Sequence, residues 1–544
     1  MRLCWVVAAL SGCLTAPERP VVAPSSTPHI ALAPVVNAGG SWRPQILTAG
    51  SKRYLPDFSY AGYRQGEAPL PEPPATHTIA EFGAVADDGQ DDTAAFQAAL
   101  SRLSQAAGPV VLTLARGRYQ LRDVIFIERS DLVLRGVGSG TDGSVLAFAK
   151  PLAELPRAPL IQELETYLIK NDKKVDGQPF SPFSWTGGLL WTRLPSPPVK
   201  LRGSAAIEGK RGQNTLRVSS APPVTSGLVE LRWFNRFGSD SPVLRHLFGL
   251  SGKVPGERLA DPSQLLTSQI LTVVRIDGDV LSFKEPLRHD VKPDWGAELA
   301  PAPARLTGVG LEHFRVEMPS EPYAGHHLER GDNAIYLTGL RDSFVRDVTI
   351  QDSDSAVLSD DCEHITLTSI VVTGRAGHYG IHLGDVDSAL VRDFDIAAPR
   401  EHSLSFNTGA RGSVFSHGRI VGPRLDQHRG RNHQNLFDAI AGTEDGAKSA
   451  LFEHGGADYW GPTHGAFNTF WNISLEFRNA ALVAQPLSLS GVIDTSEARL
   501  IGVRANVRLL LDYPGAYQDG TNRPDLAVPS LYDEQLRLRL AQRR

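Results

Sequence analysis

The apolar positions between residues 306 and 473 repeat with a nearly constant spacing. Short apolar runs end at Ile350, Val372, Ile396 and Ile420, so the steps are 22, 24 and 24 residues. Each run is too short for an independent helix and is bounded by Gly, Asp, Ser or Asn, which favour turns. A repeat of this length is typical of a solenoid, and the alternating, β-branched content indicates strands. We therefore predict an all-β chain folded as a right-handed parallel β-helix. The alternative is an irregular β-sandwich.

The two ends of the repeat carry helical patterns that could cover the open ends of a solenoid. Asp92 is a good N-cap, Phe96 and Leu103 share one apolar helical face, and Gly108 supplies a stop. We assign residues 77–150 to this capping helix and the first coils. Residues 506–544 are assigned to a C-terminal tail with a second capping helix, because Ser530 and Asp533 fit a capping box.

Residues 151–300 interrupt the rung pattern. β-like runs at 215–218, 228–233, 270–276 and 280–283 lie among Trp185, Trp191 and Trp233, and a short helix is predicted at Pro242–Phe248. We interpret this segment as an inserted β-rich subdomain, which either walls one side of a groove or is peripheral to function. The main β-helix, with the active groove, is then assigned to residues 301–505.

The N-terminus has the pattern of a secretory signal. Residues 1–13 combine a charged start, a short apolar run and the sequence Leu10-Ser11-Gly12-Cys13, which resembles a bacterial lipobox. The resemblance implies lipidation at Cys13 and export to the cell envelope. Because Leu14 follows the cysteine, it points to the outer membrane. The alternative is an ordinary signal peptide with Cys13 as a bystander. Residues 14–76 read as a Pro- and Ala-rich tether, of which Trp42 and residues 54–63 could dock on the body.

Charge and cysteine content narrow the class of protein. The 544-residue chain has a formal net charge of −5 and a pI of about 6.4, so we expect no nucleic-acid partner and contact with a membrane only through the lipid. Three cysteines, two of them in the signal segment, give no disulfide framework. We expect a monomer stabilised by its stacked core.

The start of the folded region carries a family resemblance. Phe82 through Leu100, followed by Gly117-Arg118-Tyr119 and Leu134-Arg135-Gly136, resembles the opening of pectate-lyase-superfamily β-helix proteins. Rhamnogalacturonase and epimerase-like domains and some phage tailspikes share this opening. The motif is specific for the fold and says little about activity. Its four acidic residues are interpreted as turn and cap residues: Asp87, Asp88, Asp91 and Asp92.

Pieces of the second half resemble a subgroup of pectate-lyase-like bacterial lipoproteins. The matching pieces are residues 322–329, 426–433, 435–437 and 470–473. The resemblance implies a carbohydrate-active protein with a polysaccharide as its partner. It carries over no catalytic residue.

Histidines are concentrated in the same half of the chain. Eleven of the sixteen fall between residues 326 and 464, in stretches rich in Gly, Asn and Pro. Turns at equivalent places on successive coils line up along one face of a solenoid, so distant residues can meet in one groove. Because histidine titrates nearest to neutral pH, such crowding suits proton transfer. Any single histidine could instead form a hydrogen bond that stabilises a turn.

Acid–base chemistry on a uronic-acid polymer would use these residues. β-Elimination needs a base, a cation for the sugar carboxylate and an acid for the leaving oxygen. The candidates for catalysis are His428, His433, Arg429, His378 and Tyr379. The candidates for substrate binding are Arg431, Tyr459, Trp460, His464, His326 and His327. We expect the turn that holds His428 and His433 to project from the coils, so that replacing either would spare folding.

Two further functions and one cofactor remain open. Asp360-Asp361 with Gly377-His378-Tyr379-Gly380 is similar to polygalacturonase motifs, which implies an inverting glycoside hydrolase. However, Tyr379 interrupts the glycine motif, and no Asn-Thr-Asp or Arg-Ile-Lys is found. A non-catalytic glycan-binding lipoprotein is the third function. The cofactor is unknown. Ca²⁺ is a candidate through four aspartates that could equally be turn residues: Asp352, Asp354, Asp360 and Asp361. Paired histidines with a carboxylate could hold Zn²⁺, but the sequence contains no HExxH motif and no cysteine pair.

Overall fold

The computed structural model describes residues 41–48, 51–199, 201–220, 222, 224–248, 256–452, 455–462, 465–491 and 497–542. The predicted signal segment with Cys13, the first part of the tether and His464 lie outside the described residues. Within them, no helix combines the length and apolar character needed to cross a membrane.

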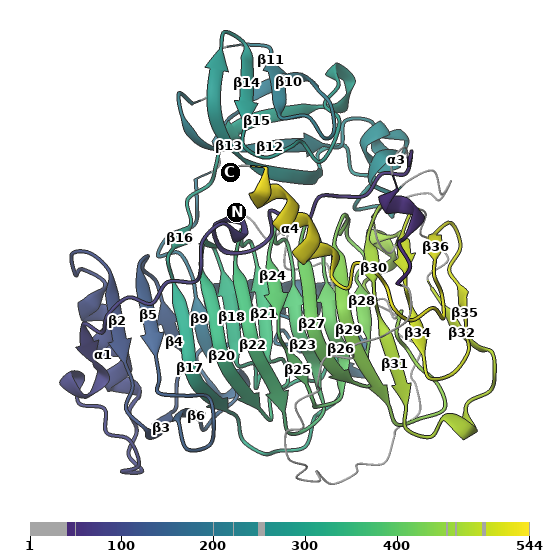
Figure 1. Ribbon diagram of the computed structural model, residues 1–544. Coiled ribbons are helices and arrows are strands. Elements are labelled where there is room, and N and C mark those ends of the chain that lie inside the picture. The colour runs from purple at the N-terminus through teal and green to yellow at the C-terminus, as the bar shows by residue number, and fades with distance from the viewer. Residues whose placement is uncertain are drawn as a thin grey trace.

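The body is a right-handed parallel β-helix whose coils stack along one axis (Figure 1). Its largest sheet contains seventeen strands. They are β1 His77–Thr78, β2 Val110–Thr113, β3 Gly117–Leu121, β5 Leu132–Arg135, β6 Ser144–Phe148, β17 Gly310–Glu317, β20 Phe344–Gln351, β22 Thr366–Thr373, β24 Leu390–Arg392, β25 Asp395–Ile396, β27 Val414–Val421, β29 Leu436–Glu444, β30 Thr469–Trp471, β31 Ser474–Phe477, β33 Arg499–Ile501, β34 Arg504–Ala505 and β36 Tyr517–Asp519. Short parallel pairs, β16 Leu306–Thr307 with β19 Leu340–Arg341 and β32 Leu487–Ser490 with β35 Leu509–Asp512, continue the coils.

The repeat predicted from the sequence is the register of this sheet. Ile350 pairs with Val372, Val372 with Ile396, and Ile396 with Ile420, each across a parallel ladder. All four side chains are at most 2% exposed. The 22- and 24-residue steps are therefore single coils, and the apolar end of each run is a layer of the core.

A second parallel sheet, of seven strands, forms another face of the coils. Its strands are β4 Ile125–Ile127, β9 Leu190–Thr192, β18 Ile335–Thr338, β21 Val357–Asp360, β23 Gly377–Leu383, β26 Arg400–Phe406 and β28 Leu425–Gln427. One ladder runs from Ile335 through Val357, Ile381 and Leu404 to Leu425, and all five are buried in the core. This sheet carries the histidines described below.

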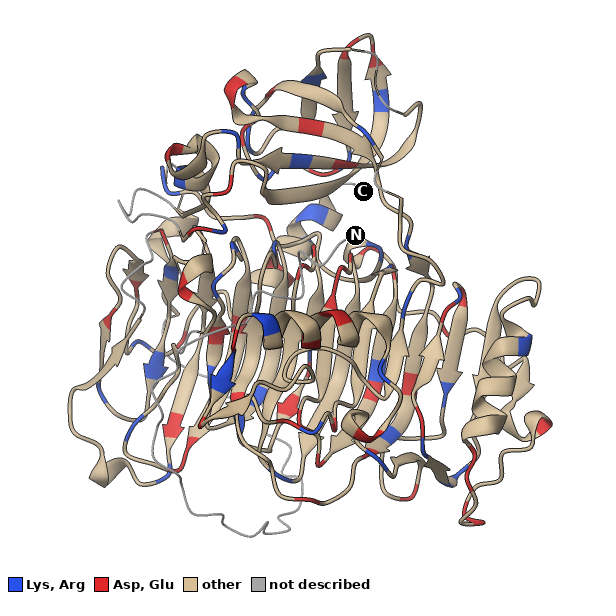
Figure 2. Ribbon diagram, turned by 180° about the vertical axis from the view of Figure 1, so that it is seen from behind, with Lys and Arg blue, Asp and Glu red and all other residues tan. Residues whose placement is uncertain are grey.

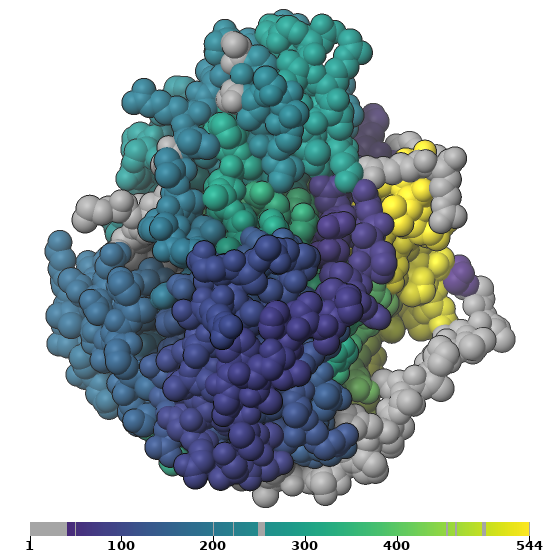
Figure 3. Space-filling model, turned by 90° about the vertical axis from the view of Figure 1, so that its left-hand side faces the viewer, coloured from purple at the N-terminus to yellow at the C-terminus, as the bar shows by residue number. Residues whose placement is uncertain are grey.

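The predicted capping helix covers the N-terminal end of the coils (Figure 3). Helix α1, Thr93–Leu103, buries Phe96 and Leu103 against the first strands, as expected. Asp92 stands at the N-cap position, but its carboxylate accepts the backbone N–H groups of Val85 and Gln120 instead of capping the helix. Asp91 binds the Thr93 N–H in its place. These carboxylates bind backbone N–H groups, as turn residues do, but Asp92 does not cap the helix with its side chain as predicted.

The inserted β-rich subdomain is a closed six-stranded barrel that stands above one edge of the coils (Figure 1). Its antiparallel strands are β10 Ser204–Gly209, β11 Thr215–Val218, β12 Gly227–Phe234, β13 Leu265–Asp277, β14 Val280–Phe283 and β15 Ala297–Pro301. Trp233 is fully buried in it, and α3, Pro242–Phe248, matches the predicted helix. Helix α2, Pro159–Lys170, and the hairpin β7 Lys174–Val175 with β8 Gln178–Pro179 precede it. Strand β9 belongs to the β-helix although it lies within 151–300.

A ladder of polar residues at one edge of the coils binds the barrel. Figure 2 shows that residues of both signs of charge are spread along the coils below the barrel. Arg341, Glu363, Asp387, Arg411 and His433 are paired in sequence, one from each successive coil. Asp387 receives the barrel residue Arg288 at 2.6 Å, and Arg411 donates to the hydroxyl of Ser268 at 3.0 Å. Burial opposes the charge of Asp387, but Arg288 and Arg411 outweigh it and lower its pKa to about 2. The barrel is thus fixed to the coils by a largely buried ion pair and a buried hydrogen bond.

The first and last described segments of the chain pack together on the outside of the large sheet. From residue 41 the predicted tether is docked, with Trp42 and Phe58 at most 7% exposed, so the anticipated docking is observed. Helix α4, Leu531–Ala541, begins at Ser530, whose hydroxyl accepts the Asp533 N–H as predicted. It does not cap the open end. Leu531 and Tyr532 instead cover the middle coils, next to Leu390, Val414 and Leu436 (Figure 1).

Candidate metal centre

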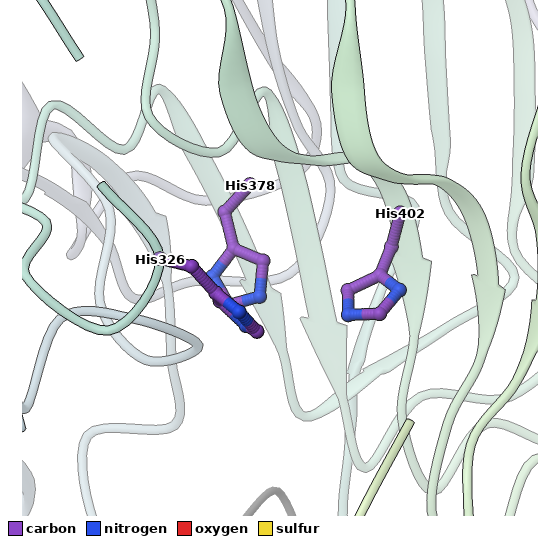
Figure 4. A group of neighbouring side chains, drawn as sticks. All are labelled: His326, His378 and His402. Atoms are coloured by element: carbon purple, nitrogen blue, oxygen red, sulfur yellow. The ribbon is translucent and has the colours of Figure 1, made fainter. Parts of the chain in front are cut away.

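Five imidazole and carboxylate side chains converge where three strands of the seven-stranded sheet end or begin. His378 comes from β23, His402 from β26 and Asp426 from β28, and His428 follows two residues later. The loop before β18 brings His326 over them. Figure 4 shows the rings of His326, His378 and His402 pointing toward one another. We call these five residues the histidine cluster.

The spacing of the histidine cluster is that of a metal site. One nitrogen from each of His326, His378 and His402 lies within 4.8 Å of the others, and one ligand atom from each of His402, Asp426 and His428 satisfies the same limit. His402 is shared, which makes the cluster continuous. Imidazole with one carboxylate is the donor set typical of Zn²⁺ and other first-row divalent ions, whereas Ca²⁺ takes only oxygen.

Several buried polar atoms of this region have no hydrogen-bond partner within the described part of the chain. They are both ring nitrogens of His327 and of His378, Nδ1 of His382 and of His402, Nε2 of His428 and Oδ1 of Asp426. His378 Nδ1 lies 3.0 Å from Glu329 Oε1, but their geometry is not that of a hydrogen bond. Unsatisfied buried groups are costly, and a bound cation would satisfy several of them at once.

Two of the imidazoles, His326 and His402, have lowered pKa values, which leaves their lone pairs available to a metal. Burial, reinforced by the neighbouring His378 ring, lowers the pKa of His326 to about 4. Burial and His428 lower the pKa of His402 well below its usual value. Metal binding requires deprotonated ligands, so His326 and His402 need not release a proton near neutral pH to bind a cation.

The ligands are oriented by a second layer of contacts. Asp426 Oδ2 lies 2.9 Å from His428 Nδ1 and accepts the hydroxyl of Ser405 at 2.5 Å. Glu329 accepts hydroxyls from Tyr323 and Ser184, at 2.9 and 2.6 Å. Such partners fix ring orientation and are typical of metal sites.

Tyr379 lies against the cluster. Its ring stacks on His378, with centroids 4.1 Å apart, and on His402, at 5.0 Å. The edge of His382 approaches it at 4.8 Å. Of the five residues in the cluster, only His326 is partly exposed, so approach from solvent is on its side.

The structure brings together part of the predicted site. His326, His327, His378, Tyr379 and His428 are gathered around one point, as the alignment of successive coils led us to expect. His402, Asp426 and Glu329 were missed. His378, His402 and Asp426 are spaced by 24 residues, the same step as Val372, Ile396 and Ile420, so extending the repeat to polar positions would have found two of them.

The remaining predicted residues lie elsewhere. Trp460 is 2% exposed, so it has no free face for a sugar ring. Tyr459 lies beneath the ammonium of Lys173, at 5.6 Å. Arg429 donates to the Gly456 carbonyl at 2.5 Å and pairs with Asp458 at 3.3 Å, within the loop that carries Tyr459 and Trp460. Arg429 therefore braces this loop.

His433 and Arg431 belong to the barrel interface. Arg431 donates to the Leu265 carbonyl of the barrel. His433 and His428 are 1% and 3% exposed, so the turn does not project from the coils as predicted. It is covered by the barrel on one side and by residues 455–461 on the other, where a Cβ on Gly455 would lie 2.2 Å from His428 Cε1.

Three imidazoles join the barrel to the coils in a chain of hydrogen bonds. His433 Nδ1 lies 2.8 Å from the Arg431 carbonyl, which can only accept, so Nδ1 carries the proton. His433 Nε2 therefore accepts from His289 Nε2 at 2.8 Å, and His289 Nδ1 accepts from His246 Nε2 at 2.8 Å. All three rings are neutral in this arrangement. Burial lowers the pKa of His433 to about 3 and that of His246 to about 4.

We expect this chain to make folding acid-sensitive. An unfolded histidine titrates near 6.5, whereas folded His433 titrates near 3, so protons bind the unfolded chain first. Stability is complete above pH 6.5 and falls as the pH drops toward 3. At pH 5 His433 should contribute about 2 kcal/mol of this loss. The free energy of unfolding, measured with urea, should decrease between pH 7.5 and pH 5 by about 2 kcal/mol less in His433→Asn than in the wild type. An unchanged dependence would contradict the assignment.

The aspartates proposed for Ca²⁺ are engaged in other contacts or form no metal group. Asp352 accepts the Arg375 N–H, and Asp354 accepts the N–H groups of Gly331 and Asp332, as turn residues do. Asp361 is bound by the side chain of Arg305. Among the described residues, the groups with metal-ligand spacing are the two within the histidine cluster. The interpretation as turn residues holds for Asp352 and Asp354.

The hydrolase motif is divided between two places. Asp360 pairs with Gly384, which lies six residues beyond His378 and directly follows the end of β23. At about 3.3 Å per residue, the histidine is roughly 20 Å from the aspartates along the sheet. Burial, with Asp385 nearby, raises the pKa of Asp361 to about 7 even though Arg305 opposes it.

Comparison with known proteins yields solved structures alone. No protein-family model matches the chain, and no curated protein matches it. The tailspike protein gp49 from Pseudomonas phage LKA1 is similar over 82% of this chain and 81% of its own, with 13% identity and a TM-score of 0.44. The A-module of the mannuronan C-5 epimerase AlgE4 from Azotobacter vinelandii is similar over 82% and 79%, with 10% identity and a TM-score of 0.35. Likeness at this level transfers no activity.

Fold and site together define a right-handed parallel β-helix protein with a buried centre of histidine and aspartate on one sheet.

Proposed function

We propose that this chain is a metal-dependent enzyme that cleaves an acidic polysaccharide by β-elimination. The observation that carries the proposal is the histidine cluster. Its ligand atoms lie within 4.8 Å of one another in each group of three, and several of its buried nitrogens have no hydrogen-bond partner among the described residues. If these buried imidazoles had a purely structural role, each ring nitrogen would be expected to have a hydrogen-bond partner within the protein.

The chemistry follows from what each group can do. A bound divalent cation would neutralise the uronate carboxylate and so acidify the neighbouring C–H. Tyr379, which stacks on His378 and His402, is the candidate we propose for moving the proton. Loss of that proton and of the glycosidic oxygen at the adjacent carbon forms the carbon–carbon double bond of the product, and the departing oxygen takes up a proton. The partly exposed His326 marks the side from which substrate enters.

A second candidate is hydrolysis at Asp360 and Asp361. An inverting hydrolase needs one protonated carboxyl group at neutral pH. Asp361 is a candidate because burial raises its pKa to about 7, although the neighbouring Arg305 acts in the opposite direction. The two candidates use different residues, so variants can separate them.

The experiment is a panel of uronic-acid polymers incubated with protein loaded in turn with Zn²⁺, Mn²⁺ or Ca²⁺. We expect ultraviolet absorbance from an unsaturated product, abolished by chelation and restored by one of the first-row ions. Tyr379→Phe should keep the metal and lose at least about 100-fold in turnover, the size expected for proton transfer. New reducing ends without absorbance, lost in Asp361→Asn and kept in Tyr379→Phe, would establish the hydrolase. Inactivity of every loaded form would refute both.

A further inference from the structure

The structure contains a cavity that is lined by no residue of the histidine cluster. It has a volume of about 500 Å³ and is formed where four segments meet: the docked N-terminal segment, the barrel, α3 and the last coils. Lys52, Arg211, Arg245, Phe467 and Arg499 each come from a different part of the sequence. The volume is within the usual range for small-molecule sites.

The cavity is lined by an excess of positive charge. Lys52, Arg53, Arg211, Arg245 and Arg499 face a single carboxylate, that of Glu497. Among the described residues, Lys52, Arg53 and Arg211 have no carboxylate within ion-pair distance. Arg245 pairs with Asp240 at 3.4 Å on the exposed surface, where such a pair is weak. Five cationic side chains beside a single carboxylate repel one another, and a bound anion would reduce this repulsion.

The cationic groups are held in place, as in a formed binding site. The Arg211 guanidinium lies over the Tyr54 ring, 3.8 Å from its centroid, and 5.1 Å from that of Phe467. The two rings meet edge to face at 4.8 Å. Stacking leaves the in-plane N–H donors of a guanidinium available for an acceptor. Arg499, 2% exposed, is fixed by two hydrogen bonds to the Tyr54 carbonyl, at 3.0 and 3.1 Å.

An acceptor for hydroxyl groups lines the same cavity. The imidazole chain described above leaves His246 with its proton on Nε2, so Nδ1 is an acceptor. Burial first, and then Arg211, lowers the pKa of His246 to about 4, so this acceptor stays neutral beside the cations. Fixed cations, aromatic rings and a neutral acceptor together match a ligand that carries carboxylate and hydroxyl groups on a ring.

We propose that this cavity binds a uronate unit of an acidic oligosaccharide, with Arg211 and Lys52 as contacts to its carboxylate. The choice of a sugar acid over another anion rests on the proposed function. The inference that the ligand is an anion rests only on the cationic lining of the cavity. Guanidinium groups bind carboxylates at two points, which fits Arg211. The site is distinct from the histidine cluster, so it would hold a substrate chain without reacting with it.

The test is calorimetric titration of the full chain, freed of metal by chelation to prevent turnover, with a uronate trisaccharide. Arg211→Gln should raise the Kd at least about tenfold, the loss expected for a charge-assisted contact. Arg217→Gln is the matched control: it lies in the same barrel, is 51% exposed, and meets Glu208 and Asp279 only at 3.8 Å. Its affinity should equal that of the wild type. Lys52 is exposed, so Lys52→Gln should weaken binding with no effect on folding. This variant tests the site even if Arg211→Gln proves unstable.

Two further ligands decide the chemistry. A neutral trisaccharide of equal length should bind at least about tenfold more weakly than the uronate, and inorganic phosphate should compete only at much higher concentration. Equal binding of the neutral sugar, or Arg211-dependent binding of phosphate without binding of uronate, would overturn the proposal, as would equal affinities in Arg211→Gln and Arg217→Gln. Arg211-dependent uronate binding by a protein that cleaves no polymer would leave this inference standing and refute only the proposed function.

Discussion

Replacing His402 with alanine is expected to remove the bound metal ion and to lower turnover on the preferred polymer by at least about 100-fold. His402 belongs to both groups of ligand atoms in the histidine cluster, so its loss breaks each of them. Metal content after dialysis, measured by mass spectrometry, should fall from about one ion per chain to almost none. Turnover is followed by the absorbance of the unsaturated product.

A stability readout separates a lost ligand from a damaged fold. Metal bound to the folded chain stabilises it by an amount that grows with concentration, about 2.7 kcal/mol at a hundred times the Kd. The wild type should therefore melt at a higher temperature with metal than with chelator, and His402→Ala should melt at the same temperature in both. A variant that keeps its ion and its turnover would show that the metal lies elsewhere.

The control is His313→Ala. His313 is also an imidazole beside a carboxylate, with Nδ1 2.8 Å from Asp347 Oδ2, but it lies on the large sheet and its side chain is 35% exposed. Removing it should change neither metal content nor turnover. If His313→Ala were as inactive as His402→Ala, the loss would reflect a general effect on the coils.

The repeat made most of the β-helix predictable. Each coil must bury an apolar layer on the next, so Ile350, Val372, Ile396 and Ile420 recur at a spacing that is visible in one dimension. The same periodicity places His378, His402 and Asp426 one coil apart. The sequence could therefore predict which face of the coils holds the site. It could not predict which residues form the site, because that depends on which end of each strand is covered by the loop that carries His326.

The barrel interface could not be predicted in the same way. His433 and His428 are five residues apart and chemically identical, yet one meets His289 of the barrel and the other meets His402. The contact that distinguishes His433 joins residues more than a hundred positions apart, because its partner is His289. An insertion between two coils obeys no period of the repeat, so its docking surface leaves no regular signal in the sequence.

That docking surface should be among the most sensitive parts of the fold, and Asp387→Asn is expected to cost about 3–5 kcal/mol. Asp387 is 1% exposed, pairs with Arg288 at 2.6 Å and with Arg411 at 3.4 Å, and accepts the Ile270 N–H of the barrel at 3.3 Å. Asparagine keeps the shape and removes the charge. Arg411 would then keep its pair with Asp385 at 2.9 Å, whereas Arg288 would have no carboxylate within ion-pair distance among the described residues.

Urea unfolding measures the loss, and proteolysis shows where it acts. If Asp387 fixes the barrel, Asp387→Asn should be cleaved faster at residues 302–305, which connect the barrel to the coils. The control is Asp277→Asn, which breaks a 2.9 Å pair with Arg275 whose side chains are 74% and 71% exposed, and it should cost under about 1 kcal/mol. Equal effects of the two variants would show that burial does not strengthen the interface pair. Because the cost of Asp387→Asn comes from stranded cations, adding Arg288→Gln should recover part of it, and this non-additivity distinguishes charge stranding from lost packing.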